Sequence, residues 1–156
     1  MSRLTNRRRR TRRGFSLIEL MTVVAVIGVL LAVGIPRYHD MKRRGYSTNV
    51  MSDINTVRIA AFNYFADNAT YPPDGGSGSP PAALVPYLPQ GFSFSGEHYT
   101  LDYDVWPSPL NPSQLVVAVT VTSSDQELVN IVARTLQAGG MGINIGNGYT
   151  YIFVGL

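Results

Sequence analysis

Glu19 is the residue of this chain whose surroundings most clearly predict chemistry. It is the only Asp, Glu, Lys or Arg among the 21 residues from Phe15 to Ile35. In lipid, a carboxylate at the centre of a helix costs about 2.5–3.5 kcal/mol and marks a functional position. A buried carboxylate is stabilised when a cation pairs with it. The sequence therefore predicts that Glu19 meets a positive charge when the protein works.

No other group of residues predicts an active site. Cys is absent, which excludes a disulfide scaffold, Cys-ligated zinc, iron–sulfur clusters and thiol catalysis. His39 and His98 have no partners at helical spacing, so we expect surface histidines, and Ser16 has no base beside it. The glycines near the C-terminus do not fit a phosphate-binding pattern. We therefore predict a protein that is not an enzyme and that needs no cofactor.

The formal net charge of +3 conceals an uneven distribution. Seven of the 13 basic residues are arginines within the first 14 positions, where no acidic residue occurs. The rest of the chain holds 6 basic and 10 acidic side chains, a net charge of −4. A cationic leader before an acidic body is typical of a targeting segment. The basic isoelectric point therefore gives little reason to expect nucleic acid as a partner.

The segment that follows the leader predicts a membrane helix. Its 21 residues would span about 32 Å at 1.5 Å per residue, enough for a bilayer core of about 30 Å. Arginines on its N-terminal side predict a cytoplasmic N-terminus, with the chain beyond Pro36 across the membrane. Two alternatives are a secretory signal peptide, cleaved after the small residues at 32–34, and a plain signal anchor. Both leave Glu19 without a role.

A third interpretation gives Glu19 a role. Residues 12–20 read RRGFSLIEL, which closely resembles the N-terminus of type IV pilins and type II secretion pseudopilins. The resemblance implies a leader, residues 1–14 with Arg12 and Arg13 near its end, that a prepilin peptidase removes after Gly14. It also implies N-methylation of Phe15 by the same enzyme. Glu19 would then pair with the Phe15 amine of a neighbouring subunit, or neutralise its own N-terminus.

The resemblance also implies a place and partners. The precursor would lie in the bacterial inner membrane, crossing the lipid bilayer at residues 15–36, with its C-terminal domain in the periplasm. An assembly platform would then build it into a filament with other pilins. Three roles remain open: a major pilin, a pseudopilin, or a minor tip pilin that binds a surface or DNA. The presence of Glu19 argues against the tip pseudopilin that lacks this glutamate.

Beyond the membrane segment, the pattern predicts a continuing helix over 37–68. Pro36 lacks a backbone N–H, so the helix should kink or melt there, as it often does in pilin filaments. Apolar residues then recur at helical spacing and predict a face that packs on a sheet. These residues are Val50, Ile54, Val57, Ala61 and Phe65. The segment after Asn68 is rich in Pro, Gly and Ser, which should end the helix.

Residues 69–156 are predicted to form a globular head. A short helical turn is expected over 82–88, and alternating or β-branched runs predict strands over 99–105 and 115–122. Ser124 and Glu127 form a capping-box pattern for a helix that ends near Gln137. The predicted fold is α+β and pilin-like, with a long N-terminal helix on a small antiparallel sheet of about four strands. The last two strands, at 142–145 and 149–154, would form a hairpin around Asn147-Gly148.

Two features of the family need separate treatment in this chain. Many major pilins close this region with a disulfide, which a chain without Cys cannot form, so we expect the hairpin to hold the C-terminus. Some pseudopilins bind calcium, for which Asp102, Asp104 and Asp125 are weak candidates. Alternate acids on a strand more often form a solvated face, so we predict no metal. The Asn68-Ala69-Thr70 triplet is formally a glycosylation site, and we expect no glycan there.

Overall fold

A computed structural model of the protein describes residues 14–137 and 141–155. Contacts within the chain divide it into a first unit that ends at His39 and a second that begins at Asp40. Helix α1, Leu17–Asn68, contributes to both units. Each unit is described separately below.

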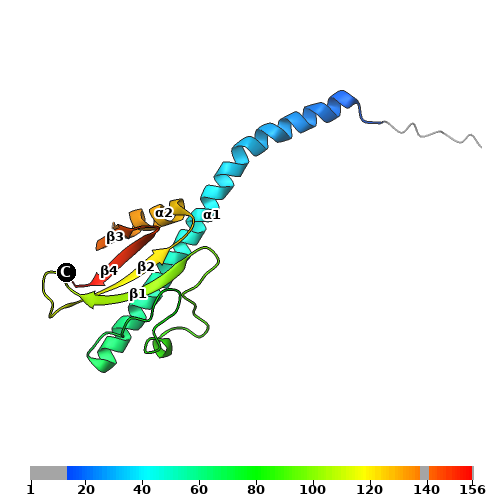
Figure 1. The fold of residues 1–156 in the computed structure, drawn as a ribbon. Helices are drawn as coiled ribbons and strands as arrows, with labels where there is room; N and C mark the ends of the chain where they lie inside the picture. The colour runs from blue at the N-terminus through cyan, green and yellow to red at the C-terminus, as the bar shows by residue number, and fades with distance from the viewer. Residues whose placement is uncertain (1–13, 138–140, 156) are drawn as a thin grey trace, which may run out of the picture. The chain divides into compact units, whose positions relative to one another are not determined.

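The second unit is built around a four-stranded antiparallel sheet (Figure 1). Strands β1 (Thr100–Pro107), β2 (Leu115–Thr122), β3 (Met141–Ile145) and β4 (Gly148–Val154) lie in the order β1-β2-β4-β3. Helix α2, Gln126–Gln137, connects β2 to β3, and a short 3-10 helix, Val85–Tyr87, lies before β1. The predicted α+β fold, with its long helix and four antiparallel strands, is confirmed.

The core of this unit lies between the helices and one face of the sheet. Val50, Ile54 and Val57 of α1 are at most 1% exposed and share one cluster with Leu101 and Tyr103 of β1. The same cluster includes apolar residues of β2, β4 and α2. The predicted packing face of α1 is thus confirmed at four of its five positions, Ala61 included.

Phe65 is the exception. It is 42% exposed, and its ring stacks on Tyr71 with ring centroids 4.6 Å apart. The prediction failed here because Phe65 lies in the last turn of α1, where the loop that follows the helix supplies its neighbour. Ala69 then ends the helix with a φ of +54°, and its N–H donates to the Phe65 carbonyl at 2.8 Å. This left-handed residue occupies the position usually taken by glycine.

Helix α1 is assigned without a break from Leu17 to Asn68, with Pro36 inside it. Of the two predicted outcomes at Pro36, a kink or melting, the unbroken helix excludes melting. A proline removes one backbone hydrogen bond, and the turns on either side keep theirs.

The N-terminus of α2 is capped one residue later than the sequence pattern suggests. Asp125, not Ser124, accepts the N–H groups of Glu127 and Leu128, at 3.1 and 3.4 Å. A carboxylate at this position satisfies two of the free N–H groups of the first turn. The capping box was misplaced because Ser124 and Asp125 are both good capping residues.

The predicted C-terminal hairpin is present, with its turn shifted by one residue. Ile145 pairs with Gly148, so Gly146 and Asn147 form the two-residue turn. Gly146 has a φ of +56°, at the position where a type II′ turn requires glycine. Gly148 is instead a strand residue: a Cβ there would lie 2.8 Å from the Val121 carbonyl oxygen. Close approach of the neighbouring strand, rather than the turn, explains this glycine.

Candidate functional site

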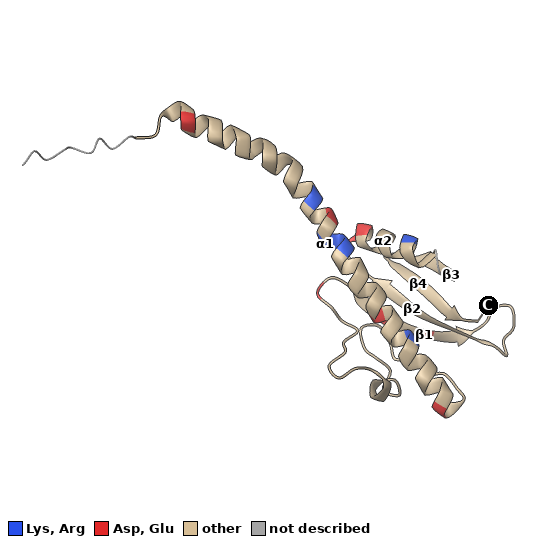
Figure 2. Ribbon diagram, turned by 180° about the vertical axis from the view of Figure 1, so that it is seen from behind, with Lys and Arg blue, Asp and Glu red and all other residues tan. Residues whose placement is uncertain are grey.

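The first unit exposes the apolar segment on every side. From Phe15 to Ile35, the large hydrophobic side chains are 49–85% exposed. Figure 2 shows the start of α1 free of charged residues apart from one acidic position. In the part of the chain that the structure describes, α1 is the one helix long and apolar enough to cross a membrane. Such an apolar surface is expected to contact lipid or another protein.

Glu19 lies in the first turn of this helix and closes a local hydrogen bond. Its Oε2 accepts the Ser16 N–H at 2.9 Å, and the Leu20 N–H donates to the Ser16 carbonyl at 3.2 Å. Ser16 and Glu19 therefore occupy the first and last positions of a capping box. Within the described residues, no cation lies at salt-bridge distance from Glu19. One neutral donor leaves most of its hydrogen-bonding capacity unused.

The other predicted residues of the N-terminal site have simple surroundings. Phe15 is 85% exposed and, like Gly14, precedes the first turn of α1. A Cβ added at Gly14 would meet nothing within 4 Å. The protein itself thus gives no steric reason for a glycine there. Arg12 and Arg13 lie outside the described residues, and Pro36 lies within α1.

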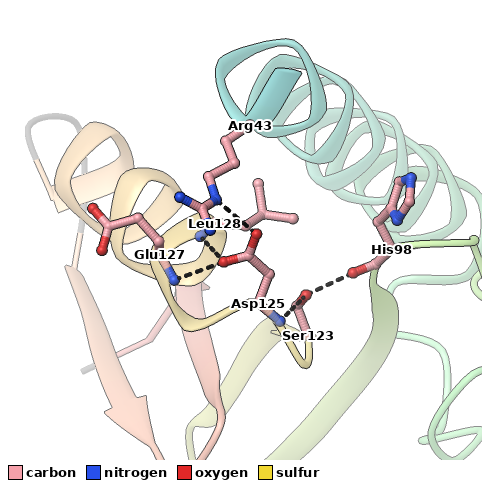
Figure 3. Close-up of polar contacts among 6 residues, drawn as sticks. All are labelled: Arg43, His98, Ser123, Asp125, Glu127 and Leu128. Carbon is pink, nitrogen blue, oxygen red and sulfur yellow. Dashed lines mark hydrogen bonds and ion pairs between the residues drawn. The ribbon is translucent and has the colours of Figure 1, made fainter. Parts of the chain in front are cut away.

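The three weak calcium candidates do not form one site. Asp125 Oδ2 accepts a hydrogen bond from Arg43 Nε at 2.8 Å, as Figure 3 shows, and its other oxygen caps α2. Arg43 holds the pKa of the Asp125 carboxyl below its usual range, and Asp125 raises the pKa of the Arg43 guanidinium. Asp125 is therefore already neutralised by a side chain of α1.

Asp102 and Asp104 lie on β1, on the face of the sheet turned away from α1, because they alternate with the buried Leu101 and Tyr103. Asp104 Oδ2 accepts the Thr120 hydroxyl at 2.6 Å. Asp102 has one buried oxygen without a partner among the described residues. Burial, with repulsion from Asp104 and Asp74, raises its pKa to about 6. No group of three metal-ligating side chains occurs in residues 14–137 and 141–155.

The histidines differ from each other. His39 is exposed as predicted, with its ring edge against Tyr38. His98 also lies at the surface but is packed: its side chain is 32% exposed, and its ring centroid lies 4.0 Å from that of Tyr46. Ser123 donates to the His98 carbonyl at 2.6 Å and accepts the Asp125 N–H at 3.1 Å (Figure 3). This chain of bonds fixes the loop before β1 next to the cap of α2.

Two contacts of the candidate residues Glu19 and Asp125 were missed from the sequence. The Ser16–Glu19 capping box has a sequence signal, since its residue types and spacing are those of the motif. The Arg43–Asp125 pair has none, because 82 positions separate the two residues and only the fold brings them together.

Comparison with known proteins places the similarity at the N-terminus. Residues 9–35 match the family described as the prokaryotic N-terminal methylation motif. A fimbrial protein of Pseudomonas aeruginosa is 44% identical over 52 residues, 33% of this chain and 34% of the relative. The type IV major fimbrial protein FimA of Dichelobacter nodosus is 48% identical over 48 residues, 31% of each chain.

A third relative comes from a secretion system. The type II secretion system core protein G of Klebsiella michiganensis is 35% identical over 65 residues, 42% of this chain and 46% of the relative. The chain thus matches 31–46% of the length of these three relatives. No solved structure matches it. The resemblance to type IV pilins and type II secretion pseudopilins is confirmed, and it lies in the N-terminal motif.

Proposed function

The chain carries the N-terminal motif of type IV pilins and type II secretion pseudopilins. We propose that it is a structural subunit of a filament and that it is made as a membrane precursor. The observation that carries this proposal is Glu19. It is the only charge in an exposed apolar segment, and it has no cation nearby among the described residues. The apolar surface needs a partner from outside the chain, and the carboxylate needs a cation that the described residues do not supply.

Processing would create the missing cation. Cleavage after Gly14 by a prepilin peptidase turns the Phe15 nitrogen into an amine, and N-methylation by the same enzyme keeps its charge. This amine would lie beside Ser16, whose N–H already donates to Glu19. Glu19 can neutralise its own N-terminus or the amine of a neighbouring subunit. Because both charges are costly in lipid, an intermolecular pair would set the position of one helix against the next.

The same mechanism gives each part of the chain a role. The leader, residues 1–14, would hold the N-terminus in the cytoplasm through its arginines and would then be removed. Residues 15–36 would cross the bacterial inner membrane and later line the filament core. Residues 37–68 would continue the helix, and residues 69–156 would form the head, in the periplasm and then on the filament surface. An inner-membrane platform would assemble the filament, and an ATPase among the partner proteins would supply the energy.

Processing is tested by replacing Gly14 with Val in cells that process the wild-type chain. Because no described residue lies within 4 Å of a Cβ at position 14, this change should leave the folded head intact and impair cleavage by the peptidase. We expect an uncleaved precursor near 17.1 kDa, with the wild-type chain shorter by the leader. N-terminal sequencing and mass spectrometry of the mature protein should start at methylated Phe15. A mature protein that starts at Ile35 would instead indicate an ordinary signal peptide.

A further inference from the structure

The two faces of the sheet in the second unit carry different charges. All five of its Lys and Arg residues lie on the helices: Lys42, Arg43, Arg44 and Arg58 on α1, and Arg134 on α2. After Asn68, the entire sequence has one Lys or Arg, Arg134 of α2, so the sheet and the loops there carry no such cation. They do carry Asp74, Glu97, Asp102 and Asp104. The helices also carry the acids Asp40, Asp53, Asp67 and Glu127, so the helix side has charges of both signs, whereas the strands carry carboxylates alone.

The outer sheet face, which is turned away from α1, has an acidic hollow. Its volume is about 460 Å³, and it is lined by Asp102, Asp104, Trp106, Thr120, Thr150 and Ile145, with Thr122 at its rim. The Thr120 hydroxyl donates to Asp104 Oδ2 at 2.6 Å and lies 2.8 Å from the Thr150 hydroxyl, within hydrogen-bonding distance. Asp102 keeps a buried oxygen without a donor among the described residues. A positively charged group would satisfy this oxygen.

Apolar side chains continue this face along the edge strand. Met141, Ile143 and Ile145 of β3 are 51–61% exposed, and register places them on the same side as Thr150. Exposed aliphatic residues next to an aromatic and a Met are characteristic of protein interfaces. A small ion would leave this apolar strip uncovered, whereas a protein surface would cover both parts.

The helix side offers a concave cationic counterpart. Two hollows of about 410 and 730 Å³ adjoin at Thr48 and Met51, between α1 and α2. Arg44, Arg58 and Arg134 line this helix groove, together with the acids Asp40 and Glu127. Across the described residues, none of the three arginines lies within salt-bridge distance of a carboxylate. Arg58 is held by neutral partners, Asn55 and Tyr151, at 2.6 and 3.4 Å.

We propose that the outer sheet face of one copy docks on the helix groove of a second copy, so that Asp102 and Asp104 meet the groove arginines. A twofold contact between outer sheet faces would instead place carboxylates against carboxylates. A contact between two different faces is heterologous, and repeating it builds rings or open filaments rather than a closed dimer. This proposal rests on the proposed filament function and adds the surfaces by which heads contact each other.

The absence of Cys from the chain allows a direct test by cross-linking in the full-length protein. Two differently tagged copies are expressed together in bacterial membranes, one with Thr48→Cys in the helix groove and the other with Thr122→Cys on the outer sheet face. Both threonines are exposed and lie on opposite sides of the sheet. We expect the mixed pair to form a disulfide about fivefold faster than either same-residue pair. Equal rates for the three pairs would overturn the proposal.

Charge reversal tests whether the arginines carry the contact. Arg134→Glu in the Thr48→Cys copy should lower mixed cross-linking about fivefold, and Asp102→Lys in the Thr122→Cys copy should restore it. Asp102→Asn, which adds no charge, should lower cross-linking by itself, and a thermal melt confirms that each variant folds. An unchanged cross-link after Arg134→Glu contradicts the proposal. So does capture of a different protein by Thr122→Cys in place of a second copy.

A third cysteine separates this proposal from the filament function. Ala32→Cys lies in the apolar segment and reports helix association within the membrane. If it cross-links while the heads do not, the head contact is wrong and the filament subunit stands. If neither cross-links under conditions of assembly, both proposals fail.

Discussion

The two units of the chain treat their apolar residues in opposite ways. In the second unit, Val50, Ile54 and Val57 are almost completely buried against the sheet. In the first, the large apolar side chains from Phe15 to Ile35 are each at least 49% exposed. Contacts within the chain explain the core of the second unit, whereas the described residues do not cover the apolar side chains of the first.

One carboxylate in each unit shows the same difference. In the second unit, Asp125 finds Arg43 within the same chain, at 2.8 Å. In the first, Glu19 finds only the Ser16 N–H among the described groups. The similarity to known proteins also lies at the N-terminus, where residues 9–35 match the methylation motif. The exposed apolar segment and Glu19 thus lie within the part of the chain that matches this motif.

The largest expected effect comes from removing the carboxylate of the first unit. Glu19→Ala should still be cleaved after Gly14 but should give at least about tenfold fewer filaments, because the amine of Phe15 then has no partner in lipid. Filaments sheared from cells and immunoblots of the processed subunit measure the two effects separately.

Thr22→Ala is the matched control. Thr22 also lies in the apolar segment, and its hydroxyl only donates to the Ile18 carbonyl, at 2.8 Å. This variant should assemble normally. Normal filaments from Glu19→Ala would refute the charge-pairing mechanism.

A core substitution tests whether the second unit is self-sufficient. Ile54→Ala should destabilise it by about 2–5 kcal/mol, because Ile54 is 1% exposed at the centre of the core cluster. Urea unfolding of the detergent-solubilised protein, followed by the fluorescence of the single Trp106, measures the change. Ile27→Ala, at a 49% exposed position, should alter the same transition by less than about 0.5 kcal/mol. Equal effects would remove the distinction between the units.

Sequence patterns predicted what depends on neighbours within a few positions. The membrane segment, the packing face at Val50, Ile54 and Val57, and the four strands follow from periodicity and β-propensity. Errors came where two local solutions had similar strength. Ser124 and Asp125 competed as the cap of α2, and Gly146 and Gly148 competed for the hairpin turn. At the cap of α2, Asp125 also pairs with Arg43. At the hairpin, Gly148 is required by the close approach of the Val121 carbonyl.

The candidate site divides in a similar way. Gly14, Phe15 and Glu19 were predicted from a local motif, within the segment of residues 9–35 that matches the family. The charges of the outer sheet face were visible in the sequence, at Asp102 and Asp104. Their meaning was not, because the strand register that sets Thr120 beside Thr150 depends on residues 30 positions apart. Pairing between residues so far apart in the chain produces no regular spacing in the sequence from which it could be predicted.

Asp102→Asn tests a charge that the second unit leaves uncompensated. Its pKa is raised to about 6, above the usual aspartate value of about 3.9, so the folded state binds the proton more tightly. The ionised form is therefore a cost that is absent below pH 4, grows through pH 6 and is complete above it. Asp102→Asn should stabilise the protein at pH 8 by about 1 kcal/mol after allowance for solvent screening, with no gain at pH 3.5.

Thermal melts at the two pH values measure this difference. Glu97→Gln is the control, because that side chain is 88% exposed and its removal should matter equally little at both. A gain for Asp102→Asn that is the same at pH 3.5 and pH 8 would show that packing, not charge, is responsible.

The smallest expected effect concerns the charge that the second unit does compensate. Asp125→Asn should keep the cap of α2, because Asn caps helices as well as Asp does, and should lose only the ion pair with Arg43. The pKa of Asp125 is lowered, so the pair stabilises the fold above the usual aspartate pKa and stops doing so as the pH falls through the lowered value. The melting point should drop slightly at neutral pH and low salt, and the drop should vanish in acid and in 1 M salt.

Asp125→Ala, which also loses the cap, should destabilise the fold by about 1 kcal/mol more than Asp125→Asn and keep that loss in 1 M salt. If Asp125→Asn is as damaging as Asp125→Ala at every salt concentration, the ion pair rather than the cap holds α2 against α1.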